Sequence, residues 1–308
     1  MTAHVIDGNL LAARLRETID EELQVLRMSS VTPGLGTIMV GEEAGASAYE
    51  RHVRRLAEGL DYHYVSERLP CDVVLPDVLA TIGKLNADPR VTGVLVLRPL
   101  PGHLPEAVVN ATVDPRKDIE GQHPENAGLL ALGRPRFVPS TPASCFYLLD
   151  SYARSTGVDP ADFYAGKTLV VVGRSTSVGK PVQWLALERH ATVLAAHSRT
   201  AAAGRLSEAT SQADILIVAA GQPGLVTGDM VSEGVIAVDV GFHTVDDPDT
   251  GKTRFVGDLD FDSVAAKAEA ITPVPGGVGP ITDVWLVGNT LVAAALSVQV
   301  EPRFGSIV

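Results

Sequence analysis

The segment Val170-Val-Val-Gly-Arg-Ser-Thr-Ser-Val-Gly-Lys180 constrains the fold more than any other part of this chain. Its apolar residues predict a buried strand that ends at Gly173, and a helix is predicted to follow. This order is typical of a nucleotide-binding unit, in which the free N–H groups at the helix start face a phosphate. Gly173 permits the tight turn and Gly179 close packing of helix on strand. The usual middle glycine is absent, with Ser175 near its place, so a turn without a ligand is the alternative.

This unit belongs to a longer alternation of predicted strands and helices. Strands are predicted at 37–40, 94–97, 167–172, 192–196, 215–219 and 235–240. Helices are predicted at 9–27, 47–60, 75–86, 142–156, 178–189, 203–212 and from about 282 to 298, with a loop-rich stretch at 102–140. Such alternation implies parallel sheets with helices on both faces.

The length of 308 residues suits two domains. We therefore expect an α/β fold with two domains. The first spans residues 1–145 and is joined by a C-terminal helix at 283–308. The second spans residues 146–282 and is of the Rossmann type.

Composition excludes several classes of partner. The net charge of −12 argues against nucleic acid and anionic membrane, because both require clustered cations. Cys71 and Cys145 lack metal-ligand spacing, so we expect free thiols, no metal and a cytoplasmic location. We also expect no signal peptide and no apolar run long enough to span a membrane.

The second strand of the nucleotide unit bears on the choice of cofactor. NAD-binding units place Asp or Glu about 20 residues after the glycine turn, to hold the ribose hydroxyl. Here the strand ends Ala196-His-Ser-Arg-Thr200, without a carboxylate. Arg174 and Arg199 are candidates to hold a 2′-phosphate, which favours NADP. The alternative is that both arginines are simply solvated.

Several motifs together resemble one enzyme family. They are Gly173-Arg-Ser175, Val178-Gly179, His197-Ser-Arg-Thr200, Thr272-Pro-Val-Pro-Gly-Gly-Val-Gly-Pro280, Tyr49, Pro99-Leu-Pro101 and Pro115-Arg-Lys-Asp118. Over residues 5–298 the chain resembles the methylenetetrahydrofolate dehydrogenase/cyclohydrolase family. The resemblance implies oxidation of 5,10-methylenetetrahydrofolate with NADP, then hydrolysis of the methenyl product. It also implies a folate cleft between the two domains, and a homodimer.

The resemblance assigns residues to each site. The substrate residues are Tyr49, Val96, Arg98, Glu120, Pro275, Gly276, Gly277, Val278 and Gly279. The cofactor residues are Thr141, Gly173, Arg174, Ser175, Val178, Gly179, Ser198, Arg199 and Phe242. The catalytic positions are Tyr49, Val53, Leu97 and Glu120.

Three of these positions depart from the family pattern. Val53 stands where the family has the lysine of the hydrolysis step, and Leu97 stands where that lysine's glutamine partner lies. Replacing both avoids leaving a buried amide unpaired, at a cost of about 1–3 kcal/mol. Glu120 replaces an aspartate that holds the pterin end. The departures predict a dehydrogenase with weak or absent cyclohydrolase activity.

Other interpretations remain open. Arg98 adds a charge to the predicted pocket, and Asp283 stands at a position that is usually apolar; either contacts an unusual ligand or is structural. An ordinary bifunctional enzyme, with His52 or Arg54 serving hydrolysis, is the first alternative. A specialised paralogue acting on a modified one-carbon substrate and a non-catalytic folate or nucleotide binder are the others.

Overall fold

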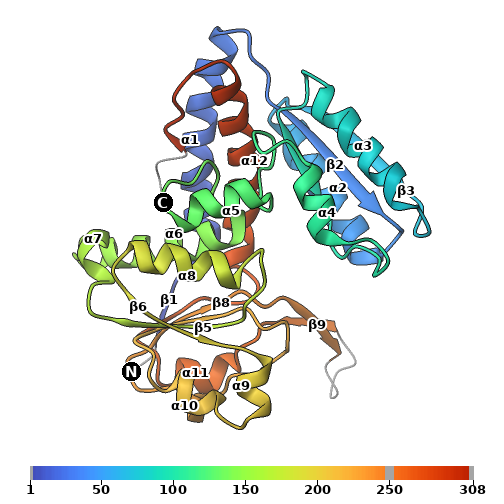
Figure 1. Cartoon of the computed structure of the whole chain (residues 1–308). Coiled ribbons are helices and arrows are strands. Elements are labelled where there is room, and N and C mark those ends of the chain that lie inside the picture. The colour runs from blue at the N-terminus through green and yellow to red at the C-terminus, as the bar shows by residue number, and fades with distance from the viewer. Residues whose placement is uncertain (1–2, 247–252, 305–308) are drawn as a thin grey trace. The chain divides into compact units, whose positions relative to one another are not determined.

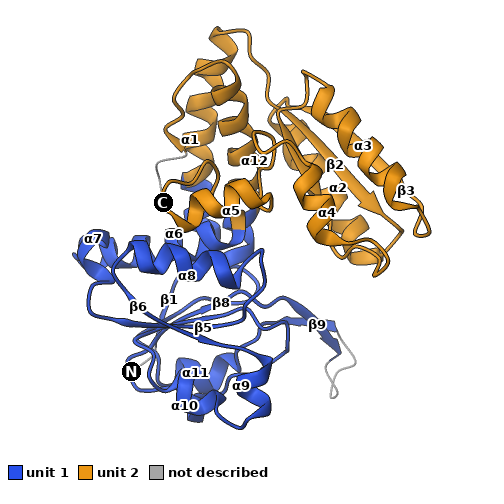
Figure 2. Ribbon diagram, in the orientation of Figure 1, with its two compact units in different colours: residues 1–14, 141–282 blue, residues 15–140, 283–308 orange. Residues whose placement is uncertain are grey.

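The computed structural model describes residues 3–246 and 253–304, and it divides into two compact units (Figure 2). Unit 1 comprises Met1–Arg14 and Thr141–Thr282, and unit 2 comprises Leu15–Ser140 and Asp283–Val308. These ranges differ from the expected ones at the N-terminus. Residues 1–14 group with unit 1 because strand β1 (His4–Val5) pairs with β11 (Ala270–Ile271).

Unit 1 contains a six-stranded sheet in the order β1-β11-β8-β7-β5-β6, in which all neighbours are parallel. The remaining strands are β5 (Thr168–Val172), β6 (Thr192–Ala196), β7 (Ile215–Val218) and β8 (Ile236–Asp239). Helices α6 (Ser140–Ser155) and α8 (Gly179–Glu188) cover one face, and α10 (Leu206–Thr210) and α11 (Phe261–Ala265) the other (Figure 1). Both faces of the sheet are therefore buried from solvent, which explains the continuous apolar runs of β5 and β7.

Smaller elements complete unit 1. They are α7 (Pro160–Phe163), α9 (Ser198–Ala202), the 3₁₀ turn η1 (Gly228–Met230) and the antiparallel hairpin β9 (His243–Asp246) and β10 (Thr253–Val256).

Unit 2 contains a three-stranded parallel sheet in the order β3-β2-β4. Its strands are β2 (Gly34–Val40), β3 (His63–Leu69) and β4 (Gly93–Val96). Its helices are α2 (Ala44–Gly59), α3 (Leu75–Ala87), α4 (Glu106–Thr112), α5 (Pro124–Ala131), most of α1 (Gly8–Met28) and, from Asp283 onward, α12 (Val278–Ser297). Ile38, Val78, Ile82 and Leu85 belong to one buried cluster between β2 and α3.

The structure corrects four element predictions. The loop-rich stretch 102–140 contains α4 and α5. The helix predicted at 203–212 is shortened to α10, which begins at Leu206, after Gly204 with its φ of +69°. Helix α12 begins at Val278, four residues before the predicted start. Strand β3 was not predicted, because its side chains are mostly half-exposed and form no apolar run.

Helix α12 also corrects the statement about apolar runs. It is long and apolar enough to cross a membrane by length and composition, and 78% of its most apolar window is buried inside the protein. Burial of this kind is what a core helix requires. The two cysteines are free, as expected, with Cys71 exposed and Cys145 buried.

Candidate active site

The glycine turn after β5 has the geometry that the sequence predicts. Gly173 has φ +140°, and a Cβ there would lie 2.3 Å from the carbonyl oxygen of Ala219. A Cβ on Gly179 would lie 2.4 Å from the carbonyl oxygen of Gly173, so α8 packs directly on the turn. Both positions exclude a larger residue for steric reasons.

The start of α8 differs from the expectation of free N–H groups. The Ser175 hydroxyl accepts hydrogen bonds from the N–H groups of Val178, at 3.1 Å, and Gly179, at 3.3 Å. These two donors are therefore already satisfied by the protein, as in ordinary helix capping. Recognition of a phosphate here relies on other groups.

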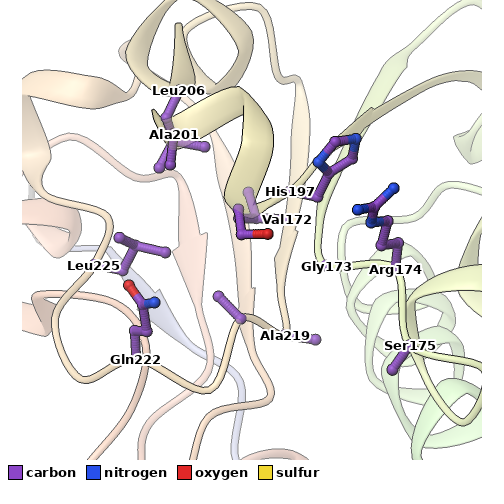
Figure 3. Close-up of a pocket in the computed structure, with 12 residues that line it drawn as sticks. Val172, Gly173, Arg174, Ser175, His197, Ala201, Leu206, Ala219, Gln222 and Leu225 are labelled. Atoms are coloured by element: carbon purple, nitrogen blue, oxygen red, sulfur yellow. The ribbon is translucent and has the colours of Figure 1, made fainter. Parts of the chain in front are cut away.

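A cavity of about 280 Å³ opens beside this turn (Figure 3). Four predicted cofactor residues line it: Gly173, Arg174, Ser175 and Ser198. Apolar side chains of Val172, Ala201, Leu206 and Leu225 form part of the wall, and His197 and Gln222 add polar groups. An apolar wall with one cation at the rim suits a flat ring that carries a phosphate.

The two arginines differ in position. Arg174 lines the cavity, whereas Arg199 does not. Both are exposed, and within residues 3–246 and 253–304 neither guanidinium forms an ion pair. The Arg199 N–H donates to Nδ1 of His197 and thereby caps α9. Arg174 is therefore the better placed of the two for a phosphate.

Four other predicted cofactor residues lie outside the lining of this cavity. Thr141 and Val178 flank helix starts, and Gly179 is buried under the turn. Phe242 is 61% exposed and stacks on Phe255 with ring centroids 4.9 Å apart.

Two buried carboxylates hold the opposite rim of the cavity. Asp258 is fully buried and accepts hydrogen bonds from the N–H groups of Ala220, Gly221 and Gln222 and from Nε2 of His243. Asp239 accepts from the N–H groups of Gly241, Asp258 and Leu259. Burial raises the pKa of Asp239 to about 6, although the hydrogen bonds oppose this. The sequence did not predict this role for Asp258.

A second group of titratable side chains lies in unit 2. Tyr49 and His52 are half-buried on the same side of α2, three residues apart. Burial is the main cause that raises the pKa of the Tyr49 phenol, and the negative charges of Glu120 and Asp283 add to it. Tyr49, Glu120 and Asp283 therefore belong to one electrostatic neighbourhood, to which His52 is joined through Asp283.

Glu120 is held by one of its two oxygens. The Ser140 hydroxyl donates to Oε2 at 2.9 Å, while Oε1 is buried without a partner. Burial, with help from the nearby Asp118, raises the pKa of Glu120 to about 7, and bonding to Ser140 opposes the shift. Asn289 on α12 donates to the carbonyl oxygen of Ile119 at 2.7 Å and fixes the preceding residue. A buried carboxyl oxygen with no partner is suited to a polar ligand atom.

Two of the three positions expected to depart from the family pattern, Val53 and Leu97, lie in the core. Val53 has no exposed surface and shares the buried face of α2 with Ala46, Glu50 and Ala57. Leu97 is only 4% exposed. Val96, the last residue of β4, is half-buried. Neither Val53 nor Leu97 presents a polar atom to the site through its side chain.

Arg54 is not available as a substitute for the lysine. It donates to Glu50 at 3.0 Å and lies over the ring of Tyr64, 5.2 Å from the centroid. Glu50 is fully buried and also accepts from Arg68 at 2.7 Å. Burial alone would favour the neutral acid, but the donated hydrogen bonds lower the pKa of Glu50 overall. The Arg54–Glu50 pair is therefore structural.

His52 lies in a different situation. Its Nε2 is 2.7 Å from Oδ2 of Asp283, with 40% of the His52 side chain and 25% of the Asp283 side chain exposed. Burial raises the pKa of Asp283, and the adjacent His52 opposes that shift. The sequence singled out both residues without predicting that they pair.

Arg98 is held by α4 at one side of its guanidinium, while its Nη1 is buried without a hydrogen-bond partner among the described residues. Its guanidinium is bonded to Asn110 of α4 and lies 3.8 Å from Glu106 of the same helix. Burial lowers its pKa, which Glu106 opposes. The added charge thus ties the segment after β4 to α4.

The remaining predicted substrate residues, Pro275–Gly279, belong to unit 1. Gly276 has φ +104°, and its carbonyl oxygen accepts from the N–H of Gly8 at 2.8 Å. A Cβ on Gly8 would lie 1.8 Å from the carbonyl oxygen of Gly277, so the start of α1 approaches this loop too closely for any residue but glycine at position 8. Among residues 3–246 and 253–304, no group of three or more His, Cys, Asp and Glu side chains is arranged to bind a metal.

Taken together, a parallel sheet with a glycine turn, and a nucleotide-sized cavity at that turn, define a Rossmann-type nucleotide-binding protein. Comparison with known proteins identifies the family. Residues 6–120 match the catalytic domain of tetrahydrofolate dehydrogenase/cyclohydrolase, and residues 139–298 match the NAD(P)-binding domain of the same proteins. The chain belongs to the tetrahydrofolate dehydrogenase/cyclohydrolase family.

Two relatives come from Rubrobacter xylanophilus. "Bifunctional protein FolD 2" is 58% identical over 306 residues, covering 99% of this chain and 95% of the relative. "Bifunctional protein FolD 3" is 57% identical over 305 residues, covering 98% and 96%. A solved structure of methylenetetrahydrofolate dehydrogenase-cyclohydrolase from Trypanosoma brucei, in complex with NADP and an inhibitor, is 34% identical. It covers 97% of this chain and 99% of its own, with a TM-score of 0.87.

The names of these relatives bear on the expected loss of hydrolysis. Two proteins that share more than half of their residues with this chain are described as bifunctional. This favours the first alternative, an ordinary bifunctional enzyme, over a dehydrogenase without cyclohydrolase activity.

Proposed function

We propose that this protein oxidises 5,10-methylenetetrahydrofolate with NADP and then hydrolyses the methenyl product to the 10-formyl form. The observation that carries the proposal is the cavity at the Gly173 turn, with the unpaired guanidinium of Arg174 at its rim. Membership of the family supplies the substrate class.

The residues of the cavity fit NADP. Val172, Ala201 and Leu206 offer an apolar surface to the adenine, and Arg174 offers a charge to the 2′-phosphate. No Asp or Glu lines the cavity, so no carboxylate repels that phosphate. When bound, NADP accepts the hydride that leaves the methylene carbon.

Residues of unit 2 serve the folate. Glu120 presents its unpartnered Oε1 to the polar edge of the pterin, while Ser140 fixes the other oxygen. A pKa of about 7 lets this carboxyl group either accept or donate a hydrogen bond at neutral pH. Tyr49 stays a neutral phenol, since burial raises its pKa, and offers a flat face to the ligand. Hydride transfer depends on orientation more than on acid-base help, and these contacts supply orientation.

Hydrolysis is included because of the bifunctional relatives, and the buried Val53 does not supply a group for it. Arg98 stays a proposed substrate residue: its Nη2 is bonded to Asn110, but its Nη1 is buried without a hydrogen-bond partner among the described residues. A homodimer in the cytoplasm, implied by the resemblance, completes the proposal.

The experiment is to mix the purified protein with 5,10-methylenetetrahydrofolate and either NADP or NAD, and to follow reduced cofactor by absorbance. We expect reduction of NADP, with a clear preference over NAD. Binding of NADP with no reduction would favour the non-catalytic alternative and contradict the proposal.

A further inference from the structure

The His52–Asp283 pair is a polar arrangement near Tyr49 that the proposed dehydrogenase step leaves unused. Its partners come from two elements, α2 and α12, and they meet at 2.7 Å between Nε2 and Oδ2. The other candidate that the sequence offered on α2, Arg54, is engaged, since it binds the buried Glu50.

We propose that His52 is the general base of the hydrolysis step and that Asp283 positions it. This inference rests on the proposed function, because it names the group that activates water against the methenyl carbon.

The pair determines which nitrogen of His52 is available. An ionised carboxylate only accepts hydrogen bonds, so Nε2 carries the hydrogen and donates it to Asp283. Nδ1 is then the lone-pair nitrogen, and within the described part of the chain it has no hydrogen-bond partner. This is the arrangement that a carboxylate imposes on a catalytic histidine in hydrolases, with the two ring nitrogens exchanged.

Position on the helix also supports the role. His52 follows Tyr49 by three residues, which brings the two side chains to one face of α2, whereas Val53 turns into the core. His52 keeps 40% of its side chain exposed, so water reaches it. Tyr49 lies within the electrostatic reach of both Glu120 and Asp283, so the base is close to the predicted folate residues.

The charges suit the reaction. The methenyl bridge carries a positive charge, and the carboxylate of Asp283 next to His52 favours a cation in this neighbourhood. A protonated lysine at this place would repel that cation, whereas the neutral imidazole that acts as a base adds no positive charge.

In the hydrolysis, water adds to the methenyl bridge and one of its C–N bonds breaks. One O–H bond of water breaks, its proton moves to Nδ1 of His52, and the oxygen bonds to the bridging carbon, whose positive charge is neutralised. The bond from that carbon to one ring nitrogen then breaks, and this nitrogen takes the proton from His52. The hydroxyl proton of the adduct passes to solvent as the formyl C=O bond forms, so the net change is addition of water and release of one proton.

The test compares the His52→Ala, His52→Gln and Asp283→Asn variants with the whole wild-type chain. Each is given methenyltetrahydrofolate without cofactor, and loss of its absorbance is followed against a buffer blank. Oxidation of 5,10-methylenetetrahydrofolate with NADP is measured on the same samples and reports an intact fold. Arg55→Gln, an exposed change on the same helix, is the matched control.

We expect both His52 variants to lose hydrolysis by about 100-fold or more, the usual contribution of a general base, while oxidation stays within about threefold. Asp283→Asn should lose hydrolysis by about tenfold or more, because the amide can donate to Nε2 and favour the tautomer in which Nδ1 carries the hydrogen. Added imidazole should restore part of the hydrolysis in His52→Ala and none in His52→Gln.

Three results would overturn the inference. They are unchanged hydrolysis in His52→Ala, equal loss of oxidation and hydrolysis with no rescue by imidazole, and wild-type hydrolysis no faster than the blank. In the first and third cases oxidation with NADP persists, so the inference fails while the dehydrogenase part of the proposed function stands. Absence of oxidation in the wild type would instead contradict the proposed function itself.

Discussion

The Ser140 hydroxyl donates a 2.9 Å hydrogen bond to Oε2 of Glu120, while Oε1 of the same carboxyl group is buried without a partner. The protein therefore satisfies one oxygen of this carboxyl group and leaves the other without a hydrogen bond. In the absence of a ligand, the unsatisfied oxygen makes the charged form costly.

The first prediction concerns the pH dependence of stability at Glu120. Its pKa is raised from 4.5 in the unfolded chain to about 7 in the folded one, so the folded state keeps a proton that the unfolded state loses. Stability from this group is therefore lost as the pH rises from 4.5 through 7. Glu120→Gln should be more stable than wild type near pH 8, by up to about 3 kcal/mol, and equal to it near pH 4.

Urea unfolding at both pH values checks this, with the exposed Glu58→Gln as the control. A Glu120→Gln effect of the same size at both pH values would mean that the carboxyl group is not desolvated.

The second prediction separates the two arginines at the nucleotide site. Arg174 lines the cavity and Arg199 does not, although both are exposed. Arg174→Ala should raise the KM for NADP by about 10- to 100-fold, the value of one charge-assisted hydrogen bond to phosphate, and leave the KM for NAD unchanged. Arg199→Ala is the matched control, with a change of about twofold or less. The reverse order of effects in steady-state kinetics would assign the 2′-phosphate to Arg199.

The third prediction concerns Asp258, which holds three successive backbone N–H groups and His243. Asn has one acceptor oxygen in place of two, so Asp258→Asn leaves buried donors unsatisfied at about 1–3 kcal/mol each. The free energy of unfolding should fall by roughly 3 kcal/mol, and the KM for NADP should rise because the loop at 220–222 loosens. Asp262→Asn, at an exposed position in α11, should change neither quantity. An Asp258→Asn variant with wild-type stability and an unchanged KM for NADP would show that Asp258 does not hold the loop at 220–222.

The fourth prediction tests whether Val53 acts only in packing. Val53 has no exposed surface, so Val53→Ala should lower the free energy of unfolding by about 2 kcal/mol and leave hydrolysis per folded molecule unchanged. Val25, which is 51% exposed, gives the control Val25→Ala, with a change of about 0.5 kcal/mol or less. If Val53→Ala lowered the rate of hydrolysis without lowering the free energy of unfolding, the Val53 side chain would have a role in the active site.

Long helices and buried strands were predictable from the sequence because their buried faces require apolar residues at regular spacing. The apolar residues Leu10, Leu11, Leu15, Ile19, Leu23 and Leu26 predicted α1, and all but Leu10 are buried. The valines before Gly173 predicted β5. The short helices α4 and α5 were missed since seven or eight residues give too few repeats of a face. Strand β3 was missed because its side chains are half-exposed and mixed in polarity.

The sequence predicted which residues belong to the candidate sites, but it predicted few of the contacts that their side chains make. Gly173 and Gly179 followed from steric need, and Glu120 from its place in a motif. Sequence spacing did not predict which partner each polar side chain binds. His52 and Asp283 are far apart in the sequence, as are Arg98 and Asn110 to a lesser degree. Arg54 lies one helix turn from Glu50, where several side chains compete for the same carboxylate. The bond from Ser175 to the start of α8 was hidden for the same reason, since a serine in a turn accepts either a ligand or the backbone.

The central claim is that one protein performs both oxidation and hydrolysis. The most direct measurement records NADPH and methenyltetrahydrofolate in a single reaction that starts from 5,10-methylenetetrahydrofolate, NADP and wild-type enzyme. We expect the concentration of NADPH to rise while that of methenyltetrahydrofolate stays far lower, because the methenyl product is converted to the 10-formyl form as it is made. Accumulation of methenyltetrahydrofolate in step with NADPH would contradict it.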